Sequence, residues 1–333
     1  MFTEAFLLRY HVSEEIYRGK PGRLTNVRNK LLQAAGRHIY KKGNVCMFEK
    51  LKSKFNKNEK YDKLIASMLV NEEYKALVDT ETYTTLNYTA LIGKEEDKPR
   101  FINMYVEYNM MIEDHAGDGK TACIDSIIAS LALKNFKENL QFYIIDTDGN
   151  YGIYKDLPHT VAYAHTKEEV RDLLDKIIYE LNLRYQQWQH FHNVKPERLG
   201  LSHIFFVLDD LDVIRDLDLT DAEMESVAKL LTVGHTFGIH CILGTKGNIT
   251  DIVDDTMIKE YKIRILFSAK DEEESFALIK EGGAQHLTEG DDAMVLRIPK
   301  RTTRDDDEPE ENFRLAPYKT PEDQTRHIIE NWK

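Results

Sequence analysis

DHAGDGKTA, at residues 114–122, is the stretch that indicates the fold class most directly. Its second half fits the phosphate-binding loop pattern G-x-x-x-x-G-K-[ST], in which glycines let backbone N–H groups turn toward phosphate oxygens. An apolar run precedes the loop, and apolar side chains recur at helical spacing from residue 124 to residue 131. A loop of this kind between a strand and a helix predicts a nucleotide site at the edge of an α/β sheet.

Each position of the loop has an expected role. Lys120 would reach the β- and γ-phosphates, and the hydroxyl of Thr121 would be a ligand of Mg²⁺. The predicted nucleotide-binding set is Gly117, Asp118, Gly119, Lys120, Thr121 and Ala122. At the first position of the motif, Asp114 replaces glycine, and a carboxylate beside a triphosphate is unfavourable unless it points away or pairs. The alternative interpretation is a chance Gly-Lys-Thr in a strand-to-helix turn.

A second motif, which ends in acidic residues, lies ~90 residues further along the chain. IFFVLDDLD, residues 204–212, is an apolar run that ends in acidic residues, as expected where a buried strand reaches the phosphate edge. Asp209 would hold Mg²⁺ through water, and Asp210 stands where a carboxylate would polarise the attacking water. Aspartate is shorter than the glutamate usual at that position. The alternative is a buried strand followed by an acidic surface turn.

From about residue 79, short apolar runs alternate with amphipathic helices, a pattern typical of a mostly parallel α/β sheet flanked by helices. The expected strands are residues 104–113, 141–146, 160–164, 203–209, 239–244, 262–267, 293–297 and a last one around 313–318, before a closing helix at 321–333. Capping-box spacing predicts helix starts at Thr166 and Thr220. Residues 1–78 are predicted to be a basic helical segment and linker, and residues 79–333 the main domain, which carries the nucleotide site.

Composition argues against two classes of protein. Three scattered cysteines, Cys46, Cys123 and Cys241, are an odd number and argue against a disulfide scaffold and for a reducing compartment. Neither an apolar run of about 18 residues nor a signal-peptide pattern is present. A membrane anchor, if this protein uses one, is therefore expected in a part that is not in this chain.

The net charge of −12 is unevenly distributed along the chain. Residues 18–60 carry 13 Lys or Arg against two acids, a balance of about +11 that leaves about −23 for the rest. A protein that tracks duplex DNA is expected to carry positive charge on its motor, so this balance disfavours nucleic acid as a partner. The basic stretch is interpreted as an arm on the acidic body, with nucleic acid or an anionic lipid surface as the alternative contact.

These motifs resemble the FtsK/SpoIIIE family of P-loop ATPases over roughly residues 90–333. YIIDTDGNYGIYKDLPH, residues 143–159, resembles the family's second strand and its L-P-H turn, and FGIHCILGTK, residues 237–246, resembles the G-I-H-L-I-L-A-T-Q strand. The resemblance implies a RecA-like fold that binds ATP and Mg²⁺. It also places Lys246 at the family's glutamine, so that Asp210 and Lys246 become the candidate catalytic residues.

Within the family, two segments look most like the ATPase modules of EssC/EccC coupling proteins of type VII secretion: ALIGKEEDKPRFINMYVEY at 90–108 and PYKTPEDQTRHIIENWK at 317–333. The resemblance implies a module at the cytoplasmic face of the cell membrane, attached through a part not in this chain. Its implied partners are secreted WXG100-like substrates and other modules of the same machine, with a homo-oligomeric ring when assembled. In that family the terminal module docks substrates and has weak or degenerate ATPase activity.

Four positions depart from the family pattern: Asp114, Asp210, Lys246 and His235, where many members have arginine. Each replaces a group that would position phosphate, water or a neighbouring protomer, and losing one such group can cost about 10²–10³ in rate. We therefore expect ATP binding with slow hydrolysis. A non-catalytic adaptor that binds secretion substrates or partners remains an alternative, and a DNA translocase or conjugation ATPase, supported by the basic stretch, is the third.

Overall fold

The computed structural model describes residues 62–80, 83, 87–115, 117–191, 194, 196–247, 254–288, 290–299 and 310–333. The chain divides into two compact units, Met1–Leu64 and Ile65–Lys333. The basic stretch at 18–60 lies outside the described residues. In the second unit, α4 (Glu72–Val78) starts at Asn71, whose side chain accepts a hydrogen bond from the amide of Tyr74.

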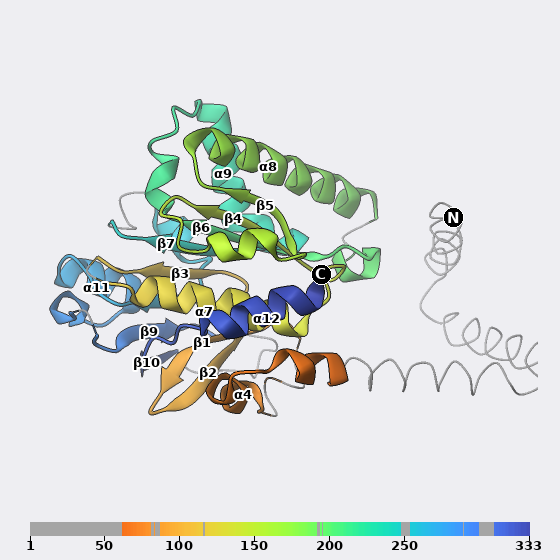
Figure 1. Ribbon diagram of the computed structural model, residues 1–333. Helices are drawn as coiled ribbons and strands as arrows, with labels where there is room; N and C mark the ends of the chain where they lie inside the picture. The colour runs from red at the N-terminus through yellow and green to blue at the C-terminus, as the bar shows by residue number, and fades with distance from the viewer. Residues whose placement is uncertain are drawn as a thin grey trace, which may run out of the picture. The chain divides into compact units, whose positions relative to one another are not determined.

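An eight-stranded sheet forms the centre of the second unit, with the order β10-β9-β8-β3-β7-β6-β4-β5 (Figure 1). The strands are β3 (Met110–Glu113), β4 (Leu140–Asp146), β5 (Thr160–Ala164), β6 (His203–Asp209), β7 (Ile239–Thr245), β8 (Ile263–Leu266), β9 (Ala293–Arg297) and β10 (Glu311–Leu315). From β8 to β5 all neighbours are parallel, and β9 and β10 extend one edge in antiparallel fashion. The predicted mostly parallel α/β sheet is confirmed.

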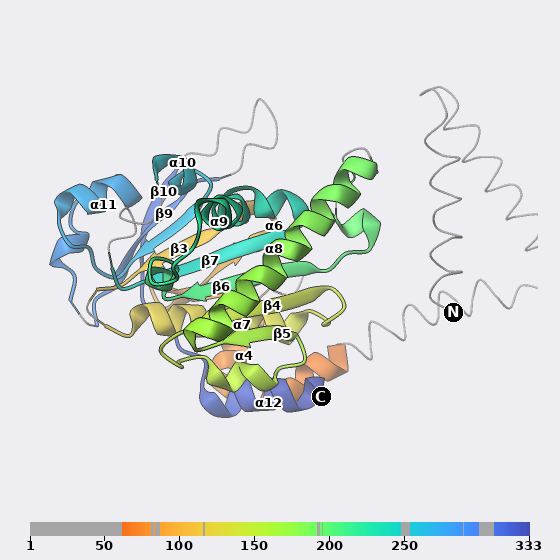
Figure 2. The same cartoon turned by 90° about the horizontal axis from the view of Figure 1, so that it is seen from above.

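Helices cover both faces of this sheet (Figures 1 and 2). On one face lie α7 (Gly119–Lys134) and α12 (Glu322–Trp332), and on the other lie α8 (Lys167–His190) and α9 (Asp221–Val233). The shorter elements are α10 (Asp255–Ile258), α11 (Glu272–Ile279) and the 3₁₀ turns η1 (Gly152–Asp156), η2 (Pro196–Leu199), η3 (Leu211–Ile214), η4 (Gly234–Phe237) and η6 (Ala284–His286). Both predicted capping boxes, at Thr166 and at Thr220, are formed.

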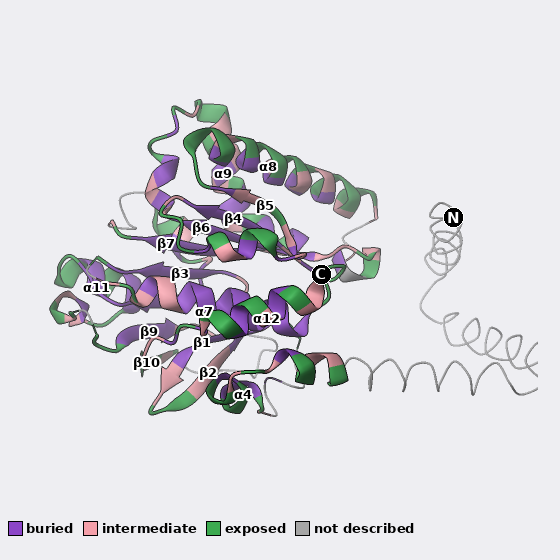
Figure 3. Ribbon diagram, in the orientation of Figure 1, coloured by how far each residue is buried: buried purple, intermediate pink, exposed green. Residues whose placement is uncertain are grey.

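Burial is deepest in the central strands (Figure 3). All residues of β6 and β7 are buried, as expected for strands with helices on both faces. The helix α7 is also buried around most of its circumference, because the sheet lies on one side and other elements lie on the opposite side. Among the described residues, no helix combines the length and the apolar character needed to cross a bilayer.

A hairpin packs on the far side of α7 and was not among the expected strands. It consists of β1 (Thr89–Glu95) and β2 (Lys98–Asn103), joined at Glu96 and Asp97, which both have positive φ. Two-residue turns of this handedness match the twist of the strands that they join. Ser130 of α7 accepts a hydrogen bond from the amide of Leu91 at 2.9 Å, so the hairpin is joined to the helix that follows the phosphate loop.

The expected strand at 104–113 is wrong in its first half. Met104–Glu107 forms the helical turn α6, and only Met110–Glu113 is a strand. The side chain of Asn103 accepts a hydrogen bond from the amide of Tyr105 at 3.0 Å and starts the turn. Tyr108, with φ of 60°, then redirects the chain into β3. These local side-chain and backbone preferences outweighed the apolar pattern of the segment.

Candidate nucleotide site

The predicted motifs meet where the parallel strands end. The phosphate loop connects β3 to α7, whose helix begins at Gly119, and Asp209 is the last residue of β6. Because carboxyl ends of parallel strands share one edge of the sheet, residues 89 positions apart come into contact. The ammonium of Lys120 forms an ion pair with Oδ1 of Asp209, and both side chains are buried.

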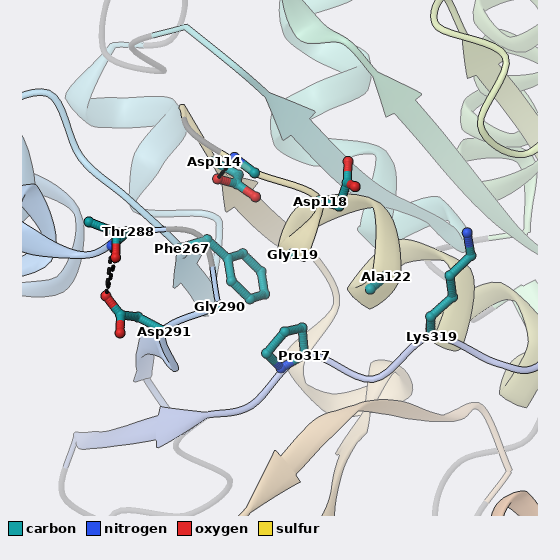
Figure 4. Close-up of a pocket in the computed structure, with 11 residues that line it drawn as sticks. Asp114, Asp118, Gly119, Ala122, Phe267, Thr288, Gly290, Asp291, Pro317 and Lys319 are labelled. Atoms are coloured by element: carbon teal, nitrogen blue, oxygen red, sulfur yellow. Dashed lines mark hydrogen bonds between the residues drawn. The ribbon is translucent and has the colours of Figure 1, made fainter.

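The backbone amides of the phosphate loop are bonded to a carboxylate of the same chain. The amide of Gly117 donates to Asp114 Oδ1 at 3.0 Å, and the amide of Lys120 donates to Asp114 Oδ2 at 3.2 Å. The hydroxyl of Ser268 lies 3.4 Å from the same Oδ1. Asp114 is buried, and Figure 4 shows its carboxyl group beside the start of α7. Its oxygens therefore stand in for the phosphate oxygens that the sequence analysis expected at these amides.

The residues expected to hold Mg²⁺ lie at the same edge. Asp209 Oδ2 accepts a hydrogen bond from the hydroxyl of Tyr151 at 2.9 Å, while its Oδ1 pairs with Lys120. A Cβ atom on Gly244 would lie 2.6 Å from Asp209 Oδ1, so the glycine in β7 leaves room for this carboxylate. Thr121 Oγ1 lies 3.4 Å from the side-chain nitrogen of Asn150. A hydroxyl and carboxylate oxygens are the ligands that Mg²⁺ prefers, and the Lys120 ammonium here occupies the place of a cation.

Two residues at this edge were not predicted. Asp146, at the end of β4, accepts hydrogen bonds from the amide of Tyr151 and from the hydroxyl of Tyr163, both at 2.7 Å. The first of these bonds orients the turn that carries Tyr151 toward Asp209. Burial, and then the charge of Asp209, raises the pKa of Tyr151, so its hydroxyl stays protonated and donates. An acid at the end of an apolar strand was the available signal for Asp146, whereas Tyr151 had none.

The two candidate catalytic residues, Asp210 and Lys246, are joined by a hydrogen bond that uses the backbone amide of Lys246 and not its ammonium. Asp210 Oδ2 accepts a hydrogen bond from the amide of Lys246 at 3.2 Å. The ammonium of Lys246 instead pairs with Asp148, and that hydrogen bond raises the pKa of Lys246. Burial raises the pKa of Asp210. His235 lies in η4, before β7, and thus at the opposite end of that strand from Lys246. Within one chain, three of the four departures share the nucleotide edge.

A cavity of about 270 Å³ opens beside the phosphate loop (Figure 4). It is lined by Asp114, Gly117, Asp118, Gly119, Ala122, Phe267, Thr288, Gly290, Asp291, Pro317 and Lys319. The ring of Phe267 lies directly against Gly119, where any Cβ atom would overlap it. Packing against Phe267 therefore requires a glycine at position 119, directly before Lys120, and the phosphate-loop motif requires it as well.

Sequence comparison finds one family. Residues 85–250 match the FtsK/SpoIIIE family. The DNA translocase FtsK of Halalkalibacterium halodurans is 24% identical over 217 residues, which are 60% of this chain and 27% of that protein. The DNA translocase SpoIIIE of Bacillus subtilis is 22% identical over 208 residues, 57% of this chain and 26% of that protein. The chain thus spans about a quarter of the length of these curated relatives.

Solved structures share the fold. The pCW3 conjugation coupling protein TcpA, in its monomer form with ATPγS, has a TM-score of 0.59 at 14% identity, covering 76% of this chain and 73% of its own. EssC (ATPases 2 and 3) from Geobacillus thermodenitrificans has 0.59 at 18%, covering 73% and 48%. EccC (ATPases 2 and 3) of Thermomonospora curvata, in complex with a signal sequence peptide, has 0.54 at 17%, covering 74% and 46%. The expected RecA-like P-loop architecture is confirmed.

Proposed function

We propose that this chain, which carries an FtsK/SpoIIIE-type P-loop ATPase module, binds ATP-Mg²⁺ at the edge formed by the phosphate loop and Asp209 and hydrolyses it slowly. The observation that carries the proposal is the anion already held by the loop. Two amides that the motif assigns to phosphate donate to the Asp114 carboxylate at 3.0 and 3.2 Å. A loop that binds a carboxylate in this way has its donors arranged for an anion.

The remaining groups have roles that follow from their places. The ammonium of Lys120, a residue of the loop, now pairs with Asp209. Once a metal ion takes its place beside Asp209, the ammonium can move to a phosphate oxygen without leaving the buried carboxylate unpaired. Thr121 and Asp209 would hold Mg²⁺, which supplies neutralisation of the phosphate charge. Tyr151 keeps Asp209 oriented. The cavity that Gly119 and Phe267 help to line adjoins the phosphate loop and can receive the remainder of the nucleotide.

Slow turnover follows from three features of the same edge. Asp114 must give up two amide hydrogen bonds before phosphate can occupy the loop. Asp210 is shorter than the glutamate usual at this position, and its Oδ2 already accepts a hydrogen bond from the amide of Lys246 at 3.2 Å. Lys246 is directed to Asp148 rather than to the phosphate loop. Assembly with neighbouring modules would then be needed for substantial hydrolysis.

For the biological role, we propose a motor module of an EssC-like type VII secretion machine, working at the cytoplasmic face of the membrane on exported proteins. The EssC and EccC structures support it through the fold, and one of them holds a signal sequence peptide. The charge also supports it, since about −23 lies outside residues 18–60 and would repel a phosphate backbone. DNA translocation is the second candidate, because the curated relatives named above are DNA translocases.

Nucleotide binding is tested by the melting temperature of the full chain with increasing ATP-Mg²⁺. At 100 times the dissociation constant, binding adds about 2.7 kcal/mol of stability, so a rise of several degrees is expected. Lys120→Met should abolish the rise, whereas Lys176→Met, an exposed lysine on α8, should retain it. An unchanged melting temperature of the wild type at millimolar nucleotide would contradict binding and favour the adaptor.

The secretion role and the DNA translocation role are distinguished by which partner the full chain binds. We expect a labelled signal peptide of a WXG100-like substrate to bind the full chain with weak dependence on salt. Duplex DNA should bind weakly, if at all. Tight DNA binding, with an affinity that falls steeply as salt increases from 50 to 200 mM, would overturn the secretion role in favour of DNA translocation.

A further inference from the structure

Three ionisable side chains converge at the start of the phosphate loop and make none of the contacts described above for the nucleotide site. They are Glu113, the last residue of β3; His115, in the loop; and Glu274, in the first turn of α11. His115 Nε2 lies 3.0 Å from Glu113 Oε1 and 3.3 Å from Glu274 Oε2. One ligand atom from each of the three lies within 4.8 Å of the others. Both carboxylates are buried, and the imidazole is 26% exposed.

A simple ion pair does not account for this arrangement. One ring nitrogen faces two carboxylate oxygens, although its single N–H can donate well to only one acceptor. The other oxygen of Glu274, Oε1, is fully buried and has no hydrogen-bond partner among the described residues. A buried, unpartnered carboxylate oxygen costs free energy unless a further group satisfies it.

We propose that Glu113, His115 and Glu274 bind a divalent transition-metal ion of the Zn²⁺ or Mn²⁺ kind beside the phosphate loop. Ligand atoms about 2.1 Å from such an ion are themselves roughly 3.0–3.4 Å apart, and the two observed separations from Nε2 fall in that range. One imidazole nitrogen with two carboxylates suits these metals better than Ca²⁺ or Mg²⁺, which prefer oxygen alone. The exposed side of His115 leaves the remaining coordination position to water.

The position of the site gives the ion an effect on the loop. The amide of His115 donates to Ser268 Oγ at 2.6 Å, and that hydroxyl lies 3.4 Å from Asp114 Oδ1. The amide of Lys270, before α11, donates to Glu274 Oε2 at 2.6 Å. An ion on the three side chains therefore joins the entrance of the phosphate loop to α11 and restrains the residue next to Asp114.

The test is metal binding by the full chain without nucleotide. The metal-stripped protein is titrated with MnCl₂ followed by electron paramagnetic resonance, and with ZnCl₂ followed by calorimetry. Thiolates are poor ligands for Mn²⁺, so the cysteines do not contribute to the first measurement. We expect one equivalent to bind. His115→Ala and Glu274→Gln should each raise the dissociation constant at least tenfold, whereas His286→Ala, an exposed histidine, should not.

One further variant, together with the choice of Glu274→Gln, keeps the result unambiguous. Asp209→Asn should leave the affinity for this ion unchanged, because Asp209 belongs to the nucleotide edge. Glu274→Gln is close in size to the native residue, so it reports on the site even if His115→Ala does not fold. Equal affinity in the wild type and in Glu274→Gln, or a wild-type equivalent that is lost in Asp209→Asn, would overturn the proposal.

Discussion

The two halves of the nucleotide edge are each filled by the chain itself, but with opposite charges. On the phosphate loop, the carboxylate of Asp114 accepts hydrogen bonds from two amides. At the end of β6, the ammonium of Lys120 pairs with Asp209. The first contact exists because aspartate replaces a glycine of the motif, whereas the second uses residues that the motif itself supplies.

The two contacts differ in how ligand binding would affect them. A metal ion at Asp209 replaces one cation by another and frees Lys120 for phosphate, so charge is exchanged for charge. At the loop, phosphate must displace Asp114, and the displaced carboxylate stays close to the incoming negative charge. The loop half of the edge, with Asp114, therefore disfavours nucleotide binding. The metal half, with Asp209, already presents a carboxylate that can bind a cation. The following variants separate these two effects.

The largest effect is expected at the metal half. Lys120→Met removes the cation from buried Asp209, and breaking a buried pair of this kind costs about 3–5 kcal/mol. Urea unfolding of the variant should show this loss, and Lys120→Met combined with Asp209→Asn should recover part of it. A loss below about 1 kcal/mol would mean that water already screens this pair.

The next effect concerns the attachment of α7, the helix that carries the loop. Asp125 accepts hydrogen bonds from the hydroxyl of Tyr154 at 2.8 Å and from the amide of Thr320 at 2.9 Å. Burial raises the pKa of Asp125 from 3.8 to about 6. Because the folded state holds the proton more tightly, the stabilising contribution is present below about pH 4 and is lost as the pH rises through about 6.

Asp125→Asn should remove this pH dependence. The free energy of unfolding of the wild type relative to Asp125→Asn should fall by up to about 3 kcal/mol between pH 4 and pH 7. Denaturant titrations of both proteins across that range measure it, and other carboxylates cancel in the difference. A constant difference at all pH values would show that Asp125 does not titrate as its burial suggests.

A gain in affinity is expected at the loop half. Asp114→Gly restores the glycine and removes the competing carboxylate, which should strengthen ATP-Mg²⁺ binding about 10- to 100-fold, or about 1.4–2.8 kcal/mol. Calorimetric titration measures the change. Asp114→Asn keeps an oxygen near the amides but loses the charge, so it should give a smaller gain. Unchanged affinity in Asp114→Gly would mean that the carboxylate does not compete with phosphate.

The smallest effect is expected at Lys246. Its ion pair with Asp148 involves side chains that are 53% and 39% exposed, and such pairs contribute little to stability. Lys246→Gln should therefore change the free energy of unfolding by less than about 0.5 kcal/mol. A larger loss in urea unfolding would show that Lys246 supports the metal half through more than this surface pair.

Most of the fold could be predicted because its cause is local. Near-continuous apolar runs predicted β4, β5, β6, β7, β8 and β9 with ends that differ from the structure by at most one residue. Capping boxes located the starts of α8 and α9, since a cap depends on residues three positions apart. The error at 104–107 arose where an asparagine cap and a positive φ at Tyr108 overrode an apolar pattern.

The sequence by itself determined the phosphate loop, the acidic strand end and the parallel sheet between them. Glycine spacing, apolar runs and their periodicity are properties of residues that lie close together in the sequence. Only the tertiary structure decided where the side chains of that edge point. The contact of Asp114 with Ser268 joins residues 154 positions apart, and that of His115 with Glu274 joins two elements from opposite halves of the chain. Contacts of this kind depend on strand order and side-chain orientation, which no local pattern encodes.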